Sequence, residues 1–271
     1  MRICYHKLAV LSGAALGALF AGSAYAVASY GNLDTTQFSL TAANCQDGVY
    51  AGTNCAVQNG NFTIDRLNSI EVGLRAKNRL DFSLIDGADG IYHALPGTFG
   101  SGSGTRALWN YEFSVNTQQG GGSLTLNQVA VLLRVDTDAS AGVSFGSYLN
   151  VFTNWDDNVY AKSGTPVSFR GLTSAAFPTS GPQAGEFGVQ QSVNPLFGNS
   201  GFMPGFNPSG PGTYEIELAV FGLNTDGTTN LNARLAGTDI TVQVPEPGTL
   251  ALLGLSLAGM AAVRRRRTTA A

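Results

Sequence analysis

Apolar and polar residues alternate along much of the chain between residues 27 and 244. The clearest run is 109–115, where large apolar residues occupy every second position. Similar runs occur at residues 70–74, 124–135, 214–220 and 240–244. A period of two with one apolar face is typical of antiparallel strands that bury one side and leave the other to solvent. In the third run the alternation shifts by one residue across Asn127 and Gln128, which predicts a β-bulge.

Segments rich in Gly, Pro and Ser separate these runs, at residues 100–104, 118–123 and 202–212. Their composition is typical of turns and loops. No uninterrupted part of the body has the 3.6-residue period of an amphipathic helix. We therefore predict an all-β fold, a single antiparallel β-sandwich that is jelly-roll-like, over residues 27–244. Within it, residues 27–68 form an elaboration at one edge.

Composition agrees with this fold class. The chain has 271 residues with 35 Gly, and only 12% of the residues are charged. Average proteins have about 7% Gly and about 25% charged residues. These values exclude a coiled coil, a polar helical bundle and disorder driven by charge repulsion.

The first 26 residues have the layout of a secretory signal peptide. A basic start precedes an apolar run at residues 8–20, and small residues, Ala24 and Ala26, stand just before Val27. This pattern predicts cleavage between Ala26 and Val27. The alternative is an anchor helix that is never cut, but this run of 13 residues is shorter than the roughly 20 that span a bilayer.

Two cysteines, Cys45 and Cys55, remain after the signal peptide. In an exported domain a pair at this spacing predicts a disulfide that closes a short loop. A metal site is the competing interpretation, but two thiols without a nearby histidine leave it at least two ligands short.

The C-terminus carries the most specific pattern. Pro245, Glu246 and Pro247 precede an apolar run at residues 249–263. Four consecutive basic residues follow: Arg264, Arg265, Arg266 and Arg267. The apolar run predicts a transmembrane helix, and the arginines hold its end in the cytoplasm, so that the body lies across the membrane. A final core helix is the alternative, but this run has no polar face.

Residues 245–271 resemble the PEP-CTERM sorting signal of exported Gram-negative bacterial proteins. The resemblance implies an exosortase-type sorting peptidase and the secretion machinery as partners. It also implies transient tethering to the inner membrane, then release to the cell surface or the extracellular space. The same segment is labelled an ice-binding protein C-terminal domain, because some bacterial ice-binding proteins carry it, but it holds no ice-binding chemistry.

The body also resembles a group of uncharacterised PEP-CTERM proteins over about residues 70–244. The resemblance rests on segments such as VGLRAKNR (72–79), DGADGIY (86–92), LWNYEFSVNT (108–117) and VAVLLRVDTD (129–138). It implies no assigned biochemistry.

The charge of the body argues against nucleic acid as a partner. Residues 27–244 hold 9 basic and 17 acidic residues, so the net charge of this segment is 9 − 17 = −8. Phosphate backbones require clustered Lys and Arg.

Acidic residues gather in three loops of the body. They are Asp86, Asp89, Asp136, Asp138, Asp156 and Asp157. Carboxylates on loops suit Ca²⁺, although none of these groups has the EF-hand spacing. The favoured interpretation is that they form turns by accepting bonds from their own backbone. The sequence predicts no cofactor, with a structural Ca²⁺ as the alternative.

Catalytic motifs are absent from the sequence. His93 is the only histidine after Ala26, and no nucleophile elbow, zinc-protease motif or phosphate-binding loop occurs. A lone histidine in a Gly-rich loop favours a solvated residue over a base. The sequence therefore predicts a protein that is not an enzyme.

The leading hypothesis is a non-enzymatic surface or matrix protein that associates with exopolysaccharide or the envelope, as the sorting signal implies. The closest alternative is a carbohydrate-binding module, for which Trp155 with Tyr148 or Tyr160 could form a stacking platform. For each of these aromatic residues a core or turn position is the favoured interpretation. An ice-binding protein would need regular rows of Thr, which the sequence lacks. An envelope hydrolase would need His93 or the loop aspartates as its acid and base.

Overall fold

A computed structural model describes most of the body of the protein. The described residues are 28–34, 59–140, 142–155, 158–164, 168–171, 181–198, 200–202, 206–246 and 248. The predicted signal peptide, the Cys45–Cys55 disulfide and the apolar segment with its four arginines lie outside these residues. Among the described residues, no helix has both the length and the apolar character needed to cross a membrane.

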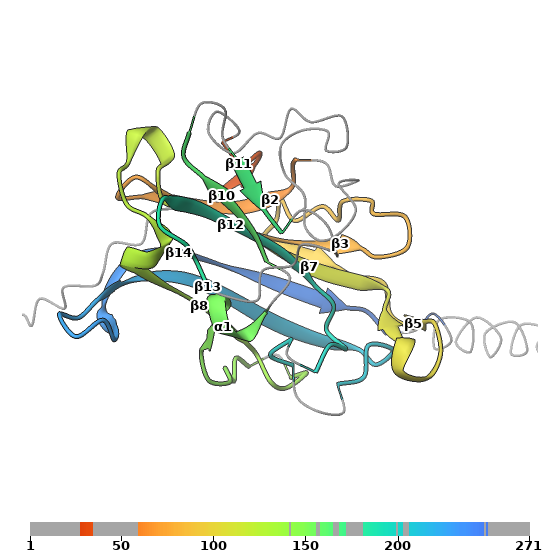
Figure 1. The fold of residues 1–271 in the computed structure, drawn as a ribbon. Coiled ribbons are helices and arrows are strands. Elements are labelled where there is room, and N and C mark those ends of the chain that lie inside the picture. Colours follow the sequence, from red (N-terminus) through yellow and green to blue (C-terminus); the bar gives the residue numbers. More distant parts are fainter. Residues whose placement is uncertain are drawn as a thin grey trace, which may run out of the picture.

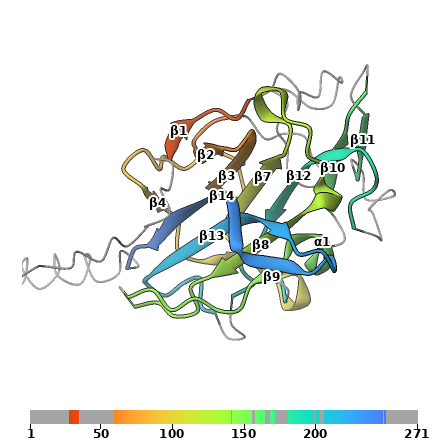
Figure 2. The same ribbon diagram turned by 90° about the vertical axis from the view of Figure 1, so that its left-hand side faces the viewer.

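Two β-sheets packed face to face make up the described body (Figures 1 and 2). The larger sheet has the order β1 (Ser29–Gly31), β2 (Phe62–Leu67), β3 (Ile70–Asn78), β7 (Trp109–Asn116), β12 (Glu186–Val193), β10 (Val159–Lys162), β11 (Ser168–Arg170). The smaller has the order β4 (Ile91–His93), β14 (Thr229–Val244), β13 (Gly212–Leu223), β8 (Val129–Val135), β9 (Leu149–Asn150). The predicted β-sandwich is confirmed, but it is not wholly antiparallel, because the edge strand β4 pairs with β14 in parallel. These two strands lie far apart in the chain, so no hairpin forces them to be antiparallel. The jelly-roll connectivity stays a prediction.

Short elements complete the described structure. They are the strand pair β5 (Thr98–Phe99) and β6 (Arg106–Ala107), the 3₁₀ turns η1 (Gly102–Gly104), η2 (Gln119–Gly121) and η3 (Leu126–Gln128), and one helical turn, α1 (Val151–Asn154).

The core lies between the sheets and is built by the alternation seen in the sequence. On β7, Trp109, Tyr111, Phe113 and Val115 are all at most 1% exposed and belong to the main apolar cluster. Strands β3, β8, β13 and β14 supply the facing residues of the same cluster. Burial of such side chains is the main favourable term in folding, at about 1.5–3 kcal/mol each.

The residues at Asn127 and Gln128 correct one prediction. They do not form a bulge inside a strand, because they belong to the 3₁₀ turn η3, and β8 begins only at Val129. Thr125 caps this turn, and its backbone N–H donates to the side-chain oxygen of Gln128 at 2.9 Å. A turn between strands shifts the alternation by one residue just as a bulge does, so the pattern alone cannot separate the two.

The second correction concerns the outer face of the larger sheet, the face that points away from the sandwich. Strands β3 and β7 are buried on both faces rather than half-buried. Residues 32–34 cross this face, where Leu33 packs with Phe62 and Ile64. Gly73 permits the crossing, because a Cβ at this position would lie 2.5 Å from Leu33 Cδ2.

Candidate functional site

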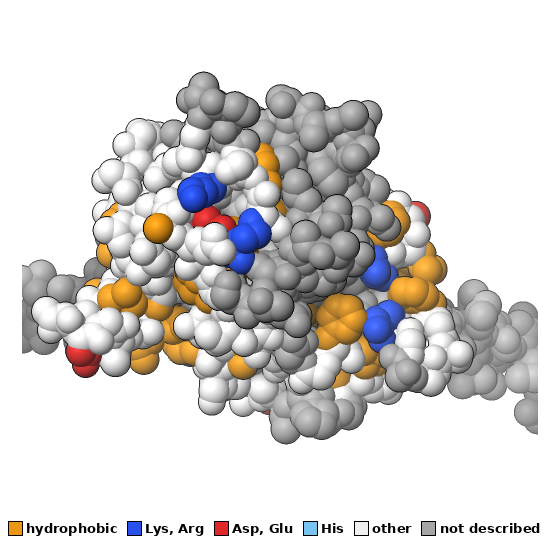
Figure 3. Space-filling model, in the orientation of Figure 1, with side chains coloured by type: hydrophobic (Ala, Val, Ile, Leu, Met, Phe, Trp, Pro, Cys, Tyr) orange, Lys and Arg blue, Asp and Glu red, His pale blue; other side chains and the backbone are white. Residues whose placement is uncertain are grey.

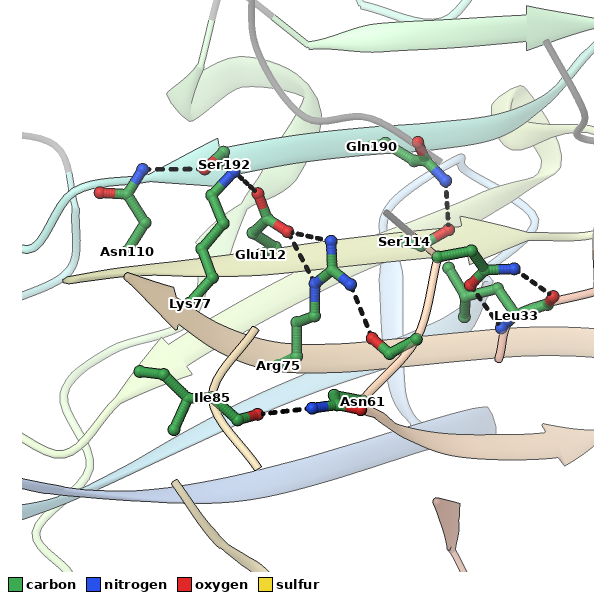
Figure 4. A network of polar contacts seen from close by, with 12 residues as sticks. Leu33, Asn61, Arg75, Lys77, Ile85, Asn110, Glu112, Ser114, Gln190 and Ser192 are labelled. Carbon is green, nitrogen blue, oxygen red and sulfur yellow. Dashed lines mark hydrogen bonds and ion pairs between the residues drawn. The ribbon is translucent and has the colours of Figure 1, made fainter. Parts of the chain in front are cut away.

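A row of polar side chains runs along the outer face of the larger sheet (Figure 4). The register of β3 and β7 sets Lys77 opposite Asn110 and Arg75 opposite Glu112. On the other side of β7, strand β12 brings Ser192 opposite Glu112. Directly opposed residues in an antiparallel pair point to the same face, with Cβ atoms about 4.5–5.5 Å apart. We call Arg75, Lys77, Asn110 and Glu112 the polar cluster.

Glu112 is the centre of the polar cluster and is 1% exposed. Its Oε2 lies 2.7 Å from Nε and 2.6 Å from Nη2 of Arg75, and its Oε1 forms an ion pair with Lys77 Nζ. Arg75 Nη1 also donates to the Gly60 carbonyl at 2.6 Å, and its guanidinium lies 4.1 Å from the centre of the Phe62 ring. One buried carboxylate therefore forms ion pairs with two buried cations.

The electrostatics of the polar cluster follow from burial. Burial raises the pKa of Glu112, but the charges of Lys77 and Arg75 outweigh this effect, so that the net pKa is lowered. Burial also lowers the pKa of Lys77 from its ordinary value, and the attraction of Glu112 only partly opposes the change. The Lys77 proton is thus held less firmly than that of an exposed lysine.

Both polar atoms of the Asn110 side-chain amide form hydrogen bonds. Its Nδ2 donates to Ser192 Oγ at 2.8 Å, and its Oδ1 accepts from Asn194 Nδ2 at 2.8 Å. Asn194 is fully buried, and its own Oδ1 accepts from the Ala107 N–H at 3.0 Å. The carbonyl of Asn110 therefore faces a rigid donor.

A second charged group lies on the outer face of the smaller sheet. Glu217 forms ion pairs with Arg134 and Arg234 and accepts from the Tyr148 hydroxyl at 3.1 Å. The Arg134 guanidinium lies 4.7 Å from the centre of the Tyr148 ring, which packs edge-on against Phe221. We call Tyr148, Arg134, Glu217 and Arg234 the Tyr148 surface. It is partly exposed, since 30% of the Arg134 side-chain surface is accessible to solvent.

The loop aspartates within the described residues form turns. Each of four carboxylates accepts a bond from the backbone N–H two residues on: Asp86 from Ala88, Asp89 from Ile91, Asp136 from Asp138 and Asp138 from Ser140. These are the bonds that the turn interpretation predicts. No cluster of three or more His, Cys, Asp or Glu side chains in the described part of the chain could hold a metal. Asp156 and Asp157 lie outside it.

His93 ends the edge strand β4 and is exposed. Its Nε2 lies 3.9 Å from Asp89 Oδ2, and both side chains are more than half exposed. An exposed pair at this distance differs from the buried, hydrogen-bonded base that nucleophilic hydrolysis uses. The placement gives the hydrolase hypothesis no support.

The stacking platform, which is the alternative interpretation, is wrong for two of its three aromatic residues, and the favoured core position is confirmed for them. Trp155 is 4% exposed and packs 5.6 Å from the Phe113 ring. Tyr160 is 1% exposed, and burial raises the pKa of its hydroxyl to about 12. Both rings belong to the main apolar cluster between the sheets. Only Tyr148 has a partly exposed ring.

Basic side chains lie in separate places on the face of the molecule shown in Figure 3, and an acidic group lies between two of them at the upper left. Six basic side chains of the described residues pair with buried glutamates: Arg66 with Glu71, Arg75 and Lys77 with Glu112, Arg134 and Arg234 with Glu217, and Arg170 with Glu186. This distribution differs from the clustered basic patch that binds phosphate backbones.

The end of β14 defines where the body stops. Val244 is buried and pairs with Gly212 on β13, whereas Pro245 and Glu246 are exposed. Proline has no backbone N–H and cannot continue the ladder, so the sheet ends at this residue. The predicted end of the last strand near Val244 is confirmed. Pro247 lies outside the described residues.

Comparison with known proteins identifies this end of the chain. The family model of the PEP-CTERM protein-sorting motif matches residues 243–267. No curated protein and no solved structure matches the chain at a significant level. The chain therefore carries a PEP-CTERM sorting signal, which marks an exported protein that an exosortase sorts to the cell surface.

Sequence reasoning missed the polar cluster. Arg75 and Lys77 alternate with apolar residues on β3, and Glu112 does so on β7, so all three looked like solvent-facing positions. The sequence did hold one signal for this cluster. Two basic residues lie two positions apart on one predicted strand, and an acidic residue lies on another.

Proposed function

We propose that this is a non-enzymatic protein of the cell surface or extracellular matrix, which associates with exopolysaccharide or the envelope. The observation that carries the proposal is the position of the sorting motif. Its match overlaps the last two residues of β14, and Pro245 and Glu246 follow directly after the buried Val244. A cut at or after Pro245 therefore leaves the whole sandwich on one side. Polysaccharide association rests on the resemblance to sorted proteins of polysaccharide-producing bacteria.

Three finer features belong to the same proposal. The chain is cut after Ala26, Cys45 and Cys55 form a disulfide in the exported form, and the segment 249–263 tethers the body until the exosortase acts. All three follow from the sequence patterns and from export.

The test compares intact masses of the protein in cells with and without the sorting peptidase. Surface protein from normal cells is expected to lack residues 249–271, and cells without the peptidase should keep the full tail in the inner membrane. Replacing Pro245, Glu246 and Pro247 with Ala should reproduce the second result in normal cells. Surface protein that still carries residues 249–271 would contradict the proposal.

A carbohydrate-binding body is the second candidate, and the Tyr148 surface favours it. It combines an aromatic ring with two guanidinium groups and a carboxylate on one partly exposed sheet face. Sugars stack on such rings and bond to such charged groups.

A glycan array, followed by titration with exopolysaccharide from the producing cells, tests the second candidate. Tyr148→Ala should weaken binding at least tenfold, while Tyr30→Ala, which removes an exposed ring of the other sheet, should leave it unchanged. Equal loss in both variants, or no binding above background, would remove this candidate.

A further inference from the structure

We propose that Lys77 and Asn110 join through an amide bond between their side chains, formed by the folded protein itself and aided by Glu112. The inference goes beyond sorting and does not depend on polysaccharide binding. It rests on three observations within the polar cluster: the register that sets the two residues opposite each other, the carboxylate on the amine and the donor on the carbonyl.

The first observation is proximity. Lys77 and Asn110 are directly opposed on neighbouring central strands and point to the same buried face (Figure 4). They are 1% and 3% exposed. Neither strand can move far, since β3 and β7 both lie inside the larger sheet. Holding two reacting groups side by side replaces an encounter between separate molecules and can supply about 7–11 kcal/mol of the barrier.

The second observation concerns the amine. An amine attacks a carbonyl only in its neutral form, and burial lowers the pKa of Lys77 toward that form. The Phe82 ring lies 5.3 Å from Nζ and supplies an apolar wall on this side. Glu112 Oε1 is paired with Nζ and is therefore placed to accept its proton.

The third observation concerns the carbonyl. Attack on Asn110 Cγ places negative charge on Oδ1, which already accepts from Asn194 Nδ2 at 2.8 Å. A preorganised donor at this position stabilises the tetrahedral intermediate. Asn194 is itself held by the backbone of Ala107 and Trp109.

The reaction balances without any other reactant. In the ion pair Lys77 is an ammonium, and it first gives one proton to Glu112. The neutral Nζ then forms a bond to Cγ of Asn110, and a second proton passes from Nζ to Nδ2 as the Cγ–Nδ2 bond breaks. The departing ammonia takes the proton held by Glu112 and leaves as ammonium, which restores the carboxylate. The product is a secondary amide, and no group is oxidised or reduced.

Such a bond would close a covalent loop over residues 77–110, which contains β4, β5 and β6. A cross-link of this kind restricts the unfolded chain, much as a disulfide does. Unlike a disulfide, it survives reduction and needs no oxidant to form.

The test is the mass of the exported protein after reduction. We expect wild-type protein to be lighter than its sequence by one ammonia, and proteolysis to yield one branched peptide that contains Lys77 and Asn110. Asn110→Ala keeps both ion pairs of Glu112 and should have the full mass of its sequence. Asn110→Asp should lose water instead of ammonia.

A second variant separates the cross-link from a cyclic imide, which Asn110 could form with its own backbone at the same loss of mass. Lys77→Met removes the amine but leaves the Arg75–Glu112 pair intact, and it should abolish the loss. Loss of ammonia that persists in Lys77→Met, or wild-type protein with the full mass of its sequence, would overturn the proposal and leave the polar cluster a structural ion pair.

Discussion

At the scale of single residues, Glu112 is the carboxylate that balances the buried charges of Arg75 and Lys77 on the outer face of the larger sheet. Removing one partner of a buried ion pair costs about 3–5 kcal/mol, because the other charge remains buried without compensation. We expect Glu112→Gln to lower the free energy of unfolding by this amount at pH 7, measured by urea denaturation. Both proteins should also carry Asn110→Ala, which keeps the ion pairs and prevents the proposed amide bond.

The effect should depend on pH in a defined direction. The folded protein lowers the pKa of Glu112 below its ordinary value of 4.5, so the contribution of the carboxylate is complete above that value. It is lost as the pH falls through the lower pKa of the folded state. The difference between the two proteins should therefore shrink in acid. Asp89→Asn, which changes an exposed carboxylate, should stay within about 0.5 kcal/mol throughout.

The polar cluster also shows what the sequence could not reveal. A charged residue at every second position of a strand predicts a solvated face unless something covers that face. Here residues 32–34 lie over Glu71 and Gly73, and the Phe62 ring lies over Arg75. The burial of Arg75, Lys77 and Glu112 thus depends on tertiary packing, which the pattern along one strand does not show.

At the scale of elements, two turns give opposite predictions about backbone strain. Asn68 and Ser69 join β2 to β3 with φ of 54° and 59°, the left-handed conformation of a two-residue hairpin turn. Non-glycine residues pay about 1–2 kcal/mol there, partly offset by the lower entropy of their unfolded chain. We expect Ser69→Gly to raise the free energy of unfolding by about 1 kcal/mol.

The matched variant is Gly227→Ala, in the turn between β13 and β14. Its φ is +81°, and a Cβ at this position would meet nothing within 4 Å. The variant should therefore lower the free energy of unfolding by about 1 kcal/mol through backbone strain alone. A change of the same sign in both variants, measured by thermal denaturation, would show that backbone strain does not govern these turns.

Strands with clean alternation were predictable, and those with mixed faces were not. The runs at 70–74, 109–115 and 214–220 lie within β3, β7 and β13. The alternation of apolar and polar residues did not predict strand β12. Gln190 and Gln191 are neighbours on opposite faces of this strand, and both are polar yet buried. Gln190 donates to Ser114 Oγ at 3.0 Å on β7, and such a partner on another strand is invisible in one sequence. Among candidate functional residues, the sorting motif was predictable because it is a local pattern.

At the scale of the whole molecule, retention before sorting should depend on the four arginines. Moving such charges through a bilayer is costly, so they hold the end of the chain in the cytoplasm. Replacing Arg264, Arg265, Arg266 and Arg267 with Gln should reduce the fraction of protein in the inner-membrane fraction and missort it. Fractionation followed by immunoblotting measures the change. Unaltered distribution between membrane and surface would contradict the predicted role.

The abrupt end of β14 limits how far the folded body can stand from the bilayer. Val244 is fixed in the sheet, and the apolar segment that we predict begins at residue 249. The five residues 245–249, fully stretched, reach at most about 16–18 Å. The exosortase must therefore cut within a narrow clearance between a rigid sandwich and the membrane surface, and the body itself limits the approach of any bulkier protease.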